Sequence, residues 1–235
     1  GWRNWQTHYL EVVAPVRACR FNSCPAHMQK ILLLSSGRFL INNTKVFEKP
    51  FKDMKMAYVI TASKGVENLD YIERERKFFK DQNFNYQEVD LDGKSSDELR
   101  DLLKNFEIVY VTGGNTFYLL KSIRQSGFDK IIRELISQGL VYMGASAGSY
   151  VMCPSIEMAT WEHQNKYNHC GVDDLTGLNS VPFLITAHFK PEYKELIQEK
   201  IKNTKYPVKI LTDEQAILIQ DDKVELIGSG SEIIL

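Results

Sequence analysis

The residues best placed to do chemistry form the segment GASAG at positions 144–148, which has the pattern G-x-S-x-G. Residues 141–145 are an apolar run of strand length, and a helix is predicted to begin at residue 147. A serine on a sharp turn between a strand and a helix projects its hydroxyl above the sheet, as a nucleophile requires. The amide of Ala147 would then stabilise an oxyanion that forms beside Ser146.

A second glycine-containing segment, TGGNT at positions 112–116, also follows an apolar run and precedes a helical pattern. In a parallel sheet this loop lies on the same rim as Ser146, so its backbone N–H groups are candidates for a second oxyanion hydrogen bond. A phosphate-binding turn is the competing interpretation. The loop has neither the G-x-G-x-x-G spacing nor the lysine of a Walker loop, which disfavours a nucleotide.

A serine nucleophile needs a base, and His188 is the best candidate because it ends the apolar run at 183–187 and so lies at the carboxyl end of a strand. His163 and His169 are the rivals, but they fall in the polar, turn-rich stretch 161–176. If the chain order is serine, acid, histidine, four residues could supply the carboxylate that orients the histidine: Glu157, Glu162, Asp173 and Asp174. Sequence spacing alone does not choose among them.

Short buried strands and amphipathic helices alternate through the chain, and this alternation would position these residues. Strands are predicted at 31–35, 57–61, 108–112 and 141–145, and helices at 68–82, 95–104, 116–125 and 128–138. Beyond residue 180 we predict a strand at 183–187, a helix at 191–203, and strands at 208–211, 216–219 and 224–227, the last two joined by a turn at 220–223. The pattern indicates an α/β fold with a mostly parallel sheet, helices on both faces and its site at the carboxyl ends of the strands.

Composition excludes several classes of protein. The 235 residues are 43% hydrophobic and 25% charged, which suits a packed globular core. Lys plus Arg number 29 and Asp plus Glu 30, a balance that does not favour nucleic acid as a partner. Apolar runs are much shorter than the roughly 20 residues of a membrane span, so no membrane association is expected.

Cysteine and histidine usage predicts neither a disulfide framework nor a metal site. Cys19 and Cys24 lie near the amino terminus, which leaves Cys153 and Cys170 in the remaining chain. There is no CxxC pair and the histidines lack zinc-binding spacing. We therefore expect a cytoplasmic protein that needs no cofactor.

The first 27 residues do not match the rest of the chain, since they lack a sustained period and the sequence changes at Met28 to MQKILLLSSG. We interpret residues 1–27 as a vector-derived or foreign leader, with a native arm as the alternative. Residues 28–235 are then predicted to form a single catalytic domain.

At these motifs the chain resembles peptidase family S51, the dipeptidase E family of serine aspartyl dipeptidases and cyanophycinases. The resemblance is carried by ILLLSSG at 31–37, VTGGNTFYLL at 111–120, GASAGSYVMCPSI at 144–156 and ITAHF at 185–189. It implies a fold like that of class I glutamine amidotransferases, with Ser146 as nucleophile, His188 as general base and the amides of Gly114 and Ala147 as the oxyanion hole. The family acid lies a short distance after the serine, which points to Glu162.

The resemblance implies a serine peptidase that cleaves short peptides through an acyl-enzyme. Residues 189–194 read FKPEYK, with lysines but no arginine after the candidate histidine, so specificity for an N-terminal aspartate is not predicted. The alternatives are an α/β-hydrolase esterase, disfavoured because the chain lacks an HGGG-type loop, and a binding or regulatory protein without turnover. The expected partner is a small peptide substrate, and the sequence leaves a homodimer open.

Overall fold

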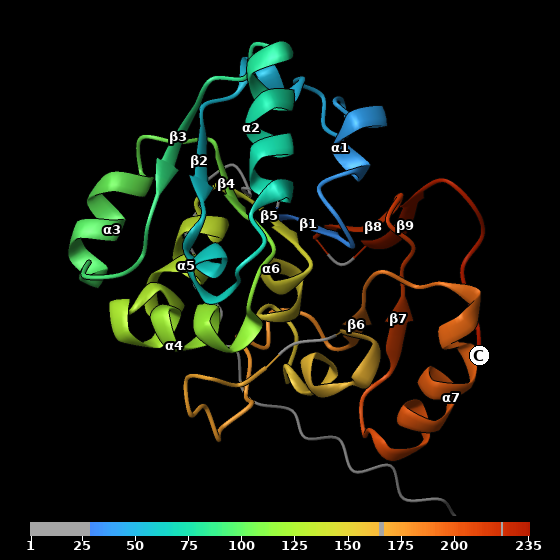
Figure 1. Cartoon of the computed structure of the whole chain (residues 1–235). Helices are drawn as coiled ribbons and strands as arrows, with labels where there is room; N and C mark the ends of the chain where they lie inside the picture. The colour runs from blue at the N-terminus through green and yellow to red at the C-terminus, as the bar shows by residue number, and fades with distance from the viewer. Residues whose placement is uncertain (1–28, 165–166, 222) are drawn as a thin grey trace, which may run out of the picture.

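The computed structural model in Figure 1 describes residues 29–164, 167–221 and 223–235, and within them the main sheet has seven strands. Their order across the sheet is β3-β2-β4-β5-β1-β8-β9. The neighbours from β3 to β1 pair in parallel, whereas β8 pairs antiparallel with β1 and β9. The strands are β1 (Lys30–Leu34), β2 (Met56–Val59), β3 (Tyr86–Val89), β4 (Ile108–Val111), β5 (Val141–Ala145), β8 (Gln215–Gln220) and β9 (Lys223–Gly228). The predicted α/β class with a mostly parallel sheet is confirmed.

Two further strands, β6 (Leu184–Thr186) and β7 (Val208–Ile210), pair in parallel with each other in a small second sheet. Helix α7 (Lys194–Asn203) connects them. Leu184 and Ile210 belong to the same buried cluster as Leu33 of the main sheet, so the two sheets share a core. The prediction of a foreign leader at 1–27 lies outside the described residues.

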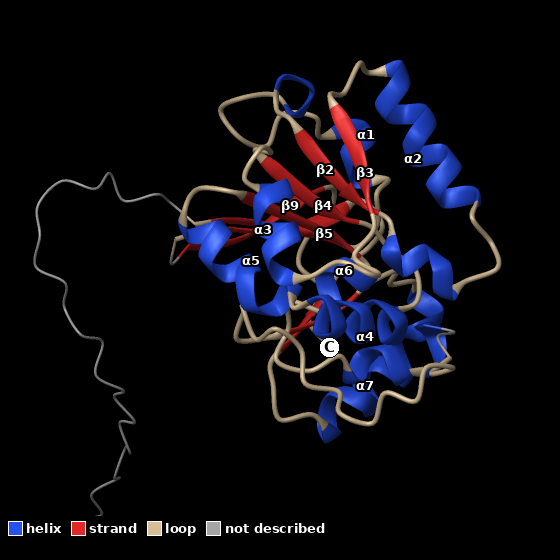
Figure 2. Cartoon of the chain, turned by 90° about the vertical axis from the view of Figure 1, so that its left-hand side faces the viewer, coloured by secondary structure: helices blue, strands red, loops and turns tan. Residues whose placement is uncertain are grey.

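Helices cover both faces of the main sheet (Figure 2). One face packs against α1 (Phe39–Asn42) and α2 (Asp70–Asp81), and the other against α3 (Ser96–Leu103), α4 (Thr116–Ser126), α5 (Phe128–Ser137) and α6 (Ala147–Tyr150). Strand residues alternate between the faces, as the period of a strand requires. On β1, for example, Leu32 and Leu34 pack with the α2 side, whereas Ile31 and Leu33 pack with the other.

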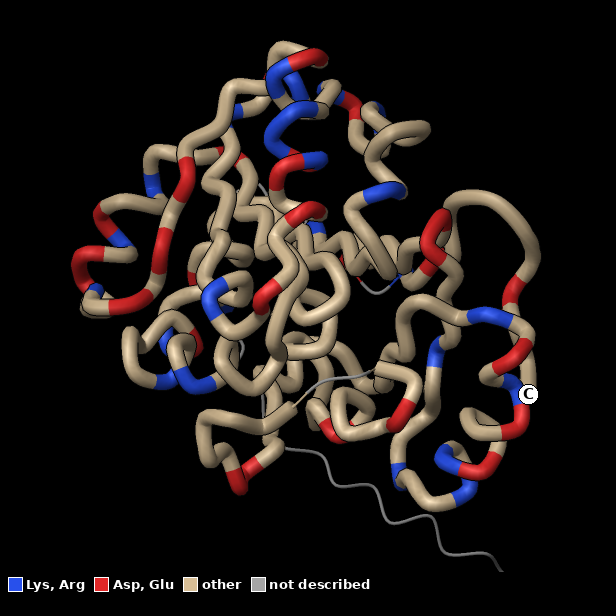
Figure 3. The backbone as a smooth tube through the Cα atoms, viewed as in Figure 1, with Lys and Arg blue, Asp and Glu red and all other residues tan. Residues whose placement is uncertain are grey.

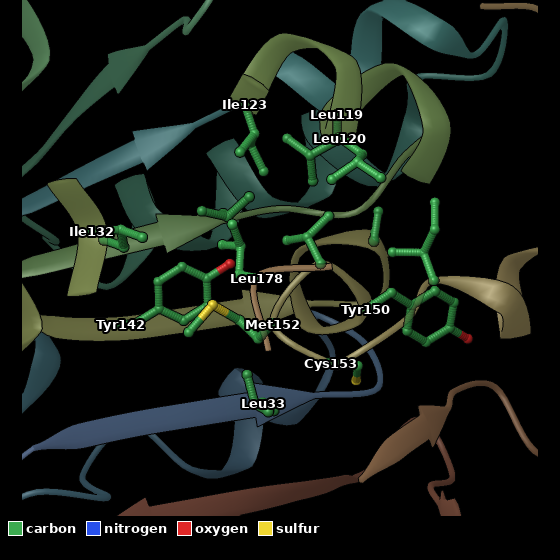
Figure 4. Packing of buried hydrophobic residues seen from close by; sticks show 14 of the residues in the cluster. Leu33, Leu119, Leu120, Ile123, Ile132, Tyr142, Tyr150, Met152, Cys153 and Leu178 are labelled. Carbon is green, nitrogen blue, oxygen red and sulfur yellow. The ribbon is translucent and has the colours of Figure 1, made fainter. Parts of the chain in front are cut away.

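The larger core explains why the central strands are apolar throughout. Figure 4 shows Leu33 and Tyr142 from neighbouring strands in the same cluster as α4 residues Leu119 and Ile123. Because helices bury both faces, these strands show nearly continuous hydrophobic runs. The same burial holds the carboxyl ends of β1, β4 and β5 firmly in place beneath the loops that follow them.

Charges of both signs are interspersed along the described chain (Figure 3). Several pair locally on helices, such as Lys77 with Asp81 on α2 at 2.7 Å. Among the described helices, none is long and apolar enough to cross a membrane.

Helix α3 begins with a capping box, and we predict its contribution to stability. The Ser95 hydroxyl accepts a hydrogen bond from the Glu98 amide at 3.3 Å, and the Glu98 carboxylate accepts one from the Ser95 amide at 2.8 Å. Ser95→Ala should lower the free energy of unfolding by about 1 kcal/mol, because it removes the acceptor for an otherwise unpaired helix amide. Urea denaturation measures this change; an unchanged midpoint would show that the cap does not stabilise the folded state.

Candidate active site

Ser146 lies on the turn between β5 and α6, where the sequence predicted a nucleophile elbow. Its backbone has φ 48° and ψ −105°, a conformation that is costly for a residue with a side chain. Its amide donates to the Leu34 carbonyl at 3.1 Å, which ties the turn to the end of β1. Only 5% of Ser146 is exposed, so its hydroxyl occupies a fixed and sheltered position.

The two glycines of the G-x-S-x-G pattern are required by close backbone packing. A Cβ on Gly144 would overlap the carbonyl of Gly148, and a Cβ on Gly148 would overlap the carbonyl of Val111 at the end of β4. Ser149 strengthens the turn, since its hydroxyl lies 2.7 Å from the carbonyl oxygens of both Leu34 and Gly144. The pattern therefore reflects a tight strand-to-helix turn that is fastened to two neighbouring strands.

His188 follows β6 and reaches Ser146 from the second sheet. Its Nε2 lies 3.1 Å from Ser146 Oγ. The His188 backbone also has a positive φ, 60°, and its amide donates to Ser35 Oγ at 2.8 Å, so the loop after β1 fixes the histidine backbone. The structure brings the two residues together as predicted, although they are separated by 42 positions in the sequence.

The second ring nitrogen of His188 contacts Asp213, a residue that sequence reasoning did not consider. Asp213 Oδ1 lies 2.6 Å from His188 Nδ1. Asp213 is in the loop between β7 and β8, and its hydrogen bond to His188 lowers the pKa of its carboxyl below the ordinary value. Arg38 lies 3.6 Å from Asp213 Oδ2. Asp213 is therefore an ionised acceptor that can orient the imidazole.

The prediction that Glu162 contacts His188 is wrong. Glu162 lies in a short 3-10 helix (Glu162–Gln164), and its exposed carboxylate accepts from Lys200 Nζ at 2.9 Å. An exposed loop carboxylate next to a lysine is held at the surface, whereas His188 Nδ1 faces the β7–β8 loop. The order serine, acid, histidine places the predicted acid before His188, whereas Asp213 follows His188 in the chain.

The other acids weighed from the sequence do not take this place either. Asp174 binds Arg124 at 2.9 Å and accepts from the Thr176 amide. In the described part of the chain, the carboxylate that hydrogen-bonds His188 is that of Asp213, and neither Glu157 nor Asp173 forms such a bond.

Neither rival histidine hydrogen-bonds the serine in the described part of the chain. His163 Nε2 is 2.9 Å from Thr186 Oγ1, and the ring is packed 5.2 Å from that of Tyr193. Burial lowers the pKa of His163 to about 4, so this imidazole is neutral at neutral pH. The His169 ring lies 5.6 Å from that of Tyr167.

The glycine loop after β4 borders the serine, as the sequence predicted. A Cβ added at Gly113 would lie 3.4 Å from Ser146 Cβ, and Gly114 has φ 139°, a conformation that favours glycine. Asn115 caps α4 by accepting from the Tyr118 amide at 3.0 Å. Loop and serine share a cavity of about 580 Å³ with His188 and Asp213.

Comparison with known proteins identifies the family. The family model described as Peptidase family S51 matches residues 31–227. The chain is 30% identical over 199 residues to an uncharacterized peptidase of Pasteurella multocida, covering 83% of this chain and 95% of that protein. It is 30% identical over 185 residues to a Peptidase E of a Nostoc species, covering 74% and 73% of the two chains.

A solved structure shows the same architecture. It is the crystal structure of a protein from Listeria monocytogenes named a putative peptidase E, which superimposes with a TM-score of 0.75 at 27% identity and covers 86% of this chain and 100% of that one. Neither the family nor this fold neighbour supports the esterase alternative. Because the family model matches most of the chain, and the elbow serine fits its class, the chain belongs to peptidase family S51 and is a serine-type peptidase.

Proposed function

We propose that the chain hydrolyses short peptides through an acyl-enzyme formed on Ser146, with His188 as general base and Asp213 as the orienting acid. The observation that carries this proposal is the pair of contacts that joins the three residues, 3.1 Å from Ser146 Oγ to His188 Nε2 and 2.6 Å from His188 Nδ1 to Asp213 Oδ1. Nucleophile, base and orienting group thus stand in the order that acyl transfer requires.

The chemistry follows from this geometry. Ser146 Oγ attacks the peptide carbonyl carbon while His188 Nε2 takes the hydroxyl proton, and the imidazolium then protonates the leaving amine as the C–N bond breaks. Water, deprotonated by the same nitrogen, attacks the ester and releases the acid, which restores the serine. Asp213 keeps the proton on Nδ1, so that Nε2 is free to accept, and it stabilises the imidazolium.

The oxyanion of the tetrahedral intermediate needs N–H donors, and the amides of Gly114 and Ala147 are our candidates. Gly114 lines the same cavity as Ser146, and Ala147 follows the nucleophile directly at the start of α6. Backbone amides at such positions are fixed before the reaction and cost no reorganisation during it.

The cavity supports a short peptide as substrate. Its volume of about 580 Å³ is within the usual range for small-molecule sites. Relatives named Peptidase E support a peptide as the substrate. A cytoplasmic location, a single catalytic domain over residues 28–235, a homodimer and the lack of a nucleic-acid partner remain predictions.

The direct test is to incubate the purified protein with a library of dipeptides that differ in the first residue and to quantify the free amino acids released. Release from a subset of dipeptides supports the proposal. Saturable binding of these dipeptides without release would favour a binding protein instead.

The assignment of the acid makes a separate prediction. Asp213→Asn should lower kcat by about 10⁴-fold, because an amide cannot keep the histidine in the correct tautomer or stabilise its charge. Glu162→Gln is the matched control and should keep kcat within about two-fold, since Glu162 pairs with Lys200 at the surface. Steady-state kinetics of both variants decide this point, and a greater loss in Glu162→Gln would contradict the assignment.

A further inference from the structure

A carboxylate that the proposed mechanism does not use lies in the wall of the same cavity. Glu75, on α2, points toward the sheet and accepts hydrogen bonds from three hydroxyls. Tyr110 donates to its Oε1 at 2.9 Å, and Tyr58 and Thr112 donate to its Oε2 at 2.5 and 2.7 Å. Two of these donors are fully buried tyrosines on neighbouring strands, so the carboxylate is held in a single position.

The loop that follows β4 connects Glu75 to the proposed nucleophile, Ser146. Thr112 binds Glu75, and a Cβ added at the next residue, Gly113, would lie 3.4 Å from Ser146 Cβ. Glu75 also borders the loop after β1, because a Cβ on Gly37 would overlap its Oε1. Glu75, Gly37, Gly113, Ser146 and His188 line one cavity.

The carboxylate has hydroxyl partners but no ion pair with a cationic side chain of the described residues. Burial raises the pKa of Glu75, because desolvation destabilises the charged carboxylate, and the charge of Arg74 offsets only part of this effect. Hydrogen bonds from the tyrosine hydroxyls compensate only part of the desolvation free energy of the carboxylate. A cation that binds it from the cavity would compensate a larger part. Arg38 and Arg74 also line the cavity, so its wall carries both positive and negative charges. Charges of both signs suit a short peptide, which is zwitterionic.

We propose that Glu75 is a specificity-determining residue that binds an ammonium group on the acyl residue of the substrate. The inference rests on the proposed peptidase function of Ser146 and concerns the class of substrate that binds in its cavity. The ammonium comes either from the free amino terminus of the peptide or from a lysine side chain. Both sources place a primary ammonium against a fixed, desolvated carboxylate, where a charge-assisted hydrogen bond is strong.

The test compares three peptides that share one leaving residue. A dipeptide with free amino-terminal Leu carries only an α-ammonium, its N-acetyl form carries none, and the peptide with N-acetyl-Lys carries only the side-chain ammonium. For the wild type, we expect kcat/KM for one of the two ammonium-bearing peptides to exceed that of N-acetyl-Leu by about 10- to 100-fold. The favoured peptide identifies the source of the ammonium.

Glu75→Gln should remove this preference mainly through a higher KM, because the amide keeps the size of the side chain but loses its charge and one of its two accepting oxygens. Glu73→Gln is the matched control, since Glu73 is on the same helix, is 67% exposed and pairs with Arg76. The rate of labelling by a neutral fluorophosphonate should stay within about two-fold of wild type in both variants, which a merely structural effect of Glu75 would not allow.

Three outcomes overturn the inference: equal kcat/KM for all three peptides in the wild type, a Glu75→Gln variant that keeps the wild-type preference, or an equal loss for all three peptides together with slower labelling in Glu75→Gln. The first needs no variant and therefore decides the matter even if Glu75→Gln does not fold. A wild type that cleaves none of the peptides and is not labelled contradicts the proposed function itself, which keeps the two failures distinct.

Discussion

Ser146→Ala is expected to lower kcat for dipeptide hydrolysis by about 10⁶-fold, because the variant has no oxygen to form the acyl-enzyme. The fold should be retained, since the turn is held by the Ser146 backbone amide, by Ser149 and by the glycines that flank it. Steady-state assays with the best dipeptide measure the effect, and circular dichroism checks the fold.

The matched control is Ser149→Ala, a serine of the same turn whose hydroxyl contacts only backbone oxygens in the hydrogen bonds described above. It should cost stability and leave kcat within about ten-fold of wild type. Turnover near wild type in a correctly folded Ser146→Ala variant would end the serine-peptidase mechanism proposed here.

His188→Gln is expected to reduce kcat nearly as much as Ser146→Ala, because without the imidazole no group at 3.1 Å from Ser146 Oγ can take and return the proton. Losses from nucleophile and base are not additive, so the double variant Ser146→Ala/His188→Gln should be no less active than the worse single variant. Kinetics of the three proteins on one substrate test both expectations.

His163→Gln is the control for this prediction. His163 hydrogen-bonds Thr186, and its lowered pKa of about 4 leaves it neutral at neutral pH. Most of the activity should remain. If His163→Gln proved as damaging as His188→Gln, the assignment of the base would be wrong.

The sequence predicted the sheet well where both faces are covered by helices. Strands β1, β4 and β5 are nearly continuous apolar runs, and burial on both faces is the physical reason for this pattern. Strand β3 was not predicted. It lies at the edge of the sheet, and its sequence YQEV exposes Gln87 and Glu88, so neither a hydrophobic run nor a clear alternation marks it.

The site was predicted in part. Ser146 and the glycine loop follow neighbouring buried strands, and His188 follows a third apolar run, so the rule that parallel strands bring their carboxyl ends together was enough to associate them. Asp213 was missed because the acid was sought only between the serine and the histidine. A usable signal was present, since Asp213 follows the apolar run at 208–211 just as His188 follows its own strand.

The spatial meeting of His188 and Asp213 could not be derived from either run alone. It depends on β6 and β7 pairing in parallel, with Thr186 opposite Ile210, which brings the loops that follow these strands side by side. The hydrogen bonds from the Leu211 amide to the Thr186 carbonyl and from the Phe189 amide to the Leu211 carbonyl then fix the register of the two loops. Strand pairing over long sequence distances is the information that local patterns lack.

The most direct test of the account is to treat the protein with a fluorophosphonate and to locate the adduct by mass spectrometry of its peptides. We expect a single modification on Ser146 that forms rapidly in the wild type and is abolished in Ser146→Ala. Labelling should be strongly slowed in both His188→Gln and Asp213→Asn, whereas Glu162→Gln should be labelled at the rate of the wild type. Labelling that persists in Ser146→Ala, or that depends on Glu162 and not on Asp213, would contradict it.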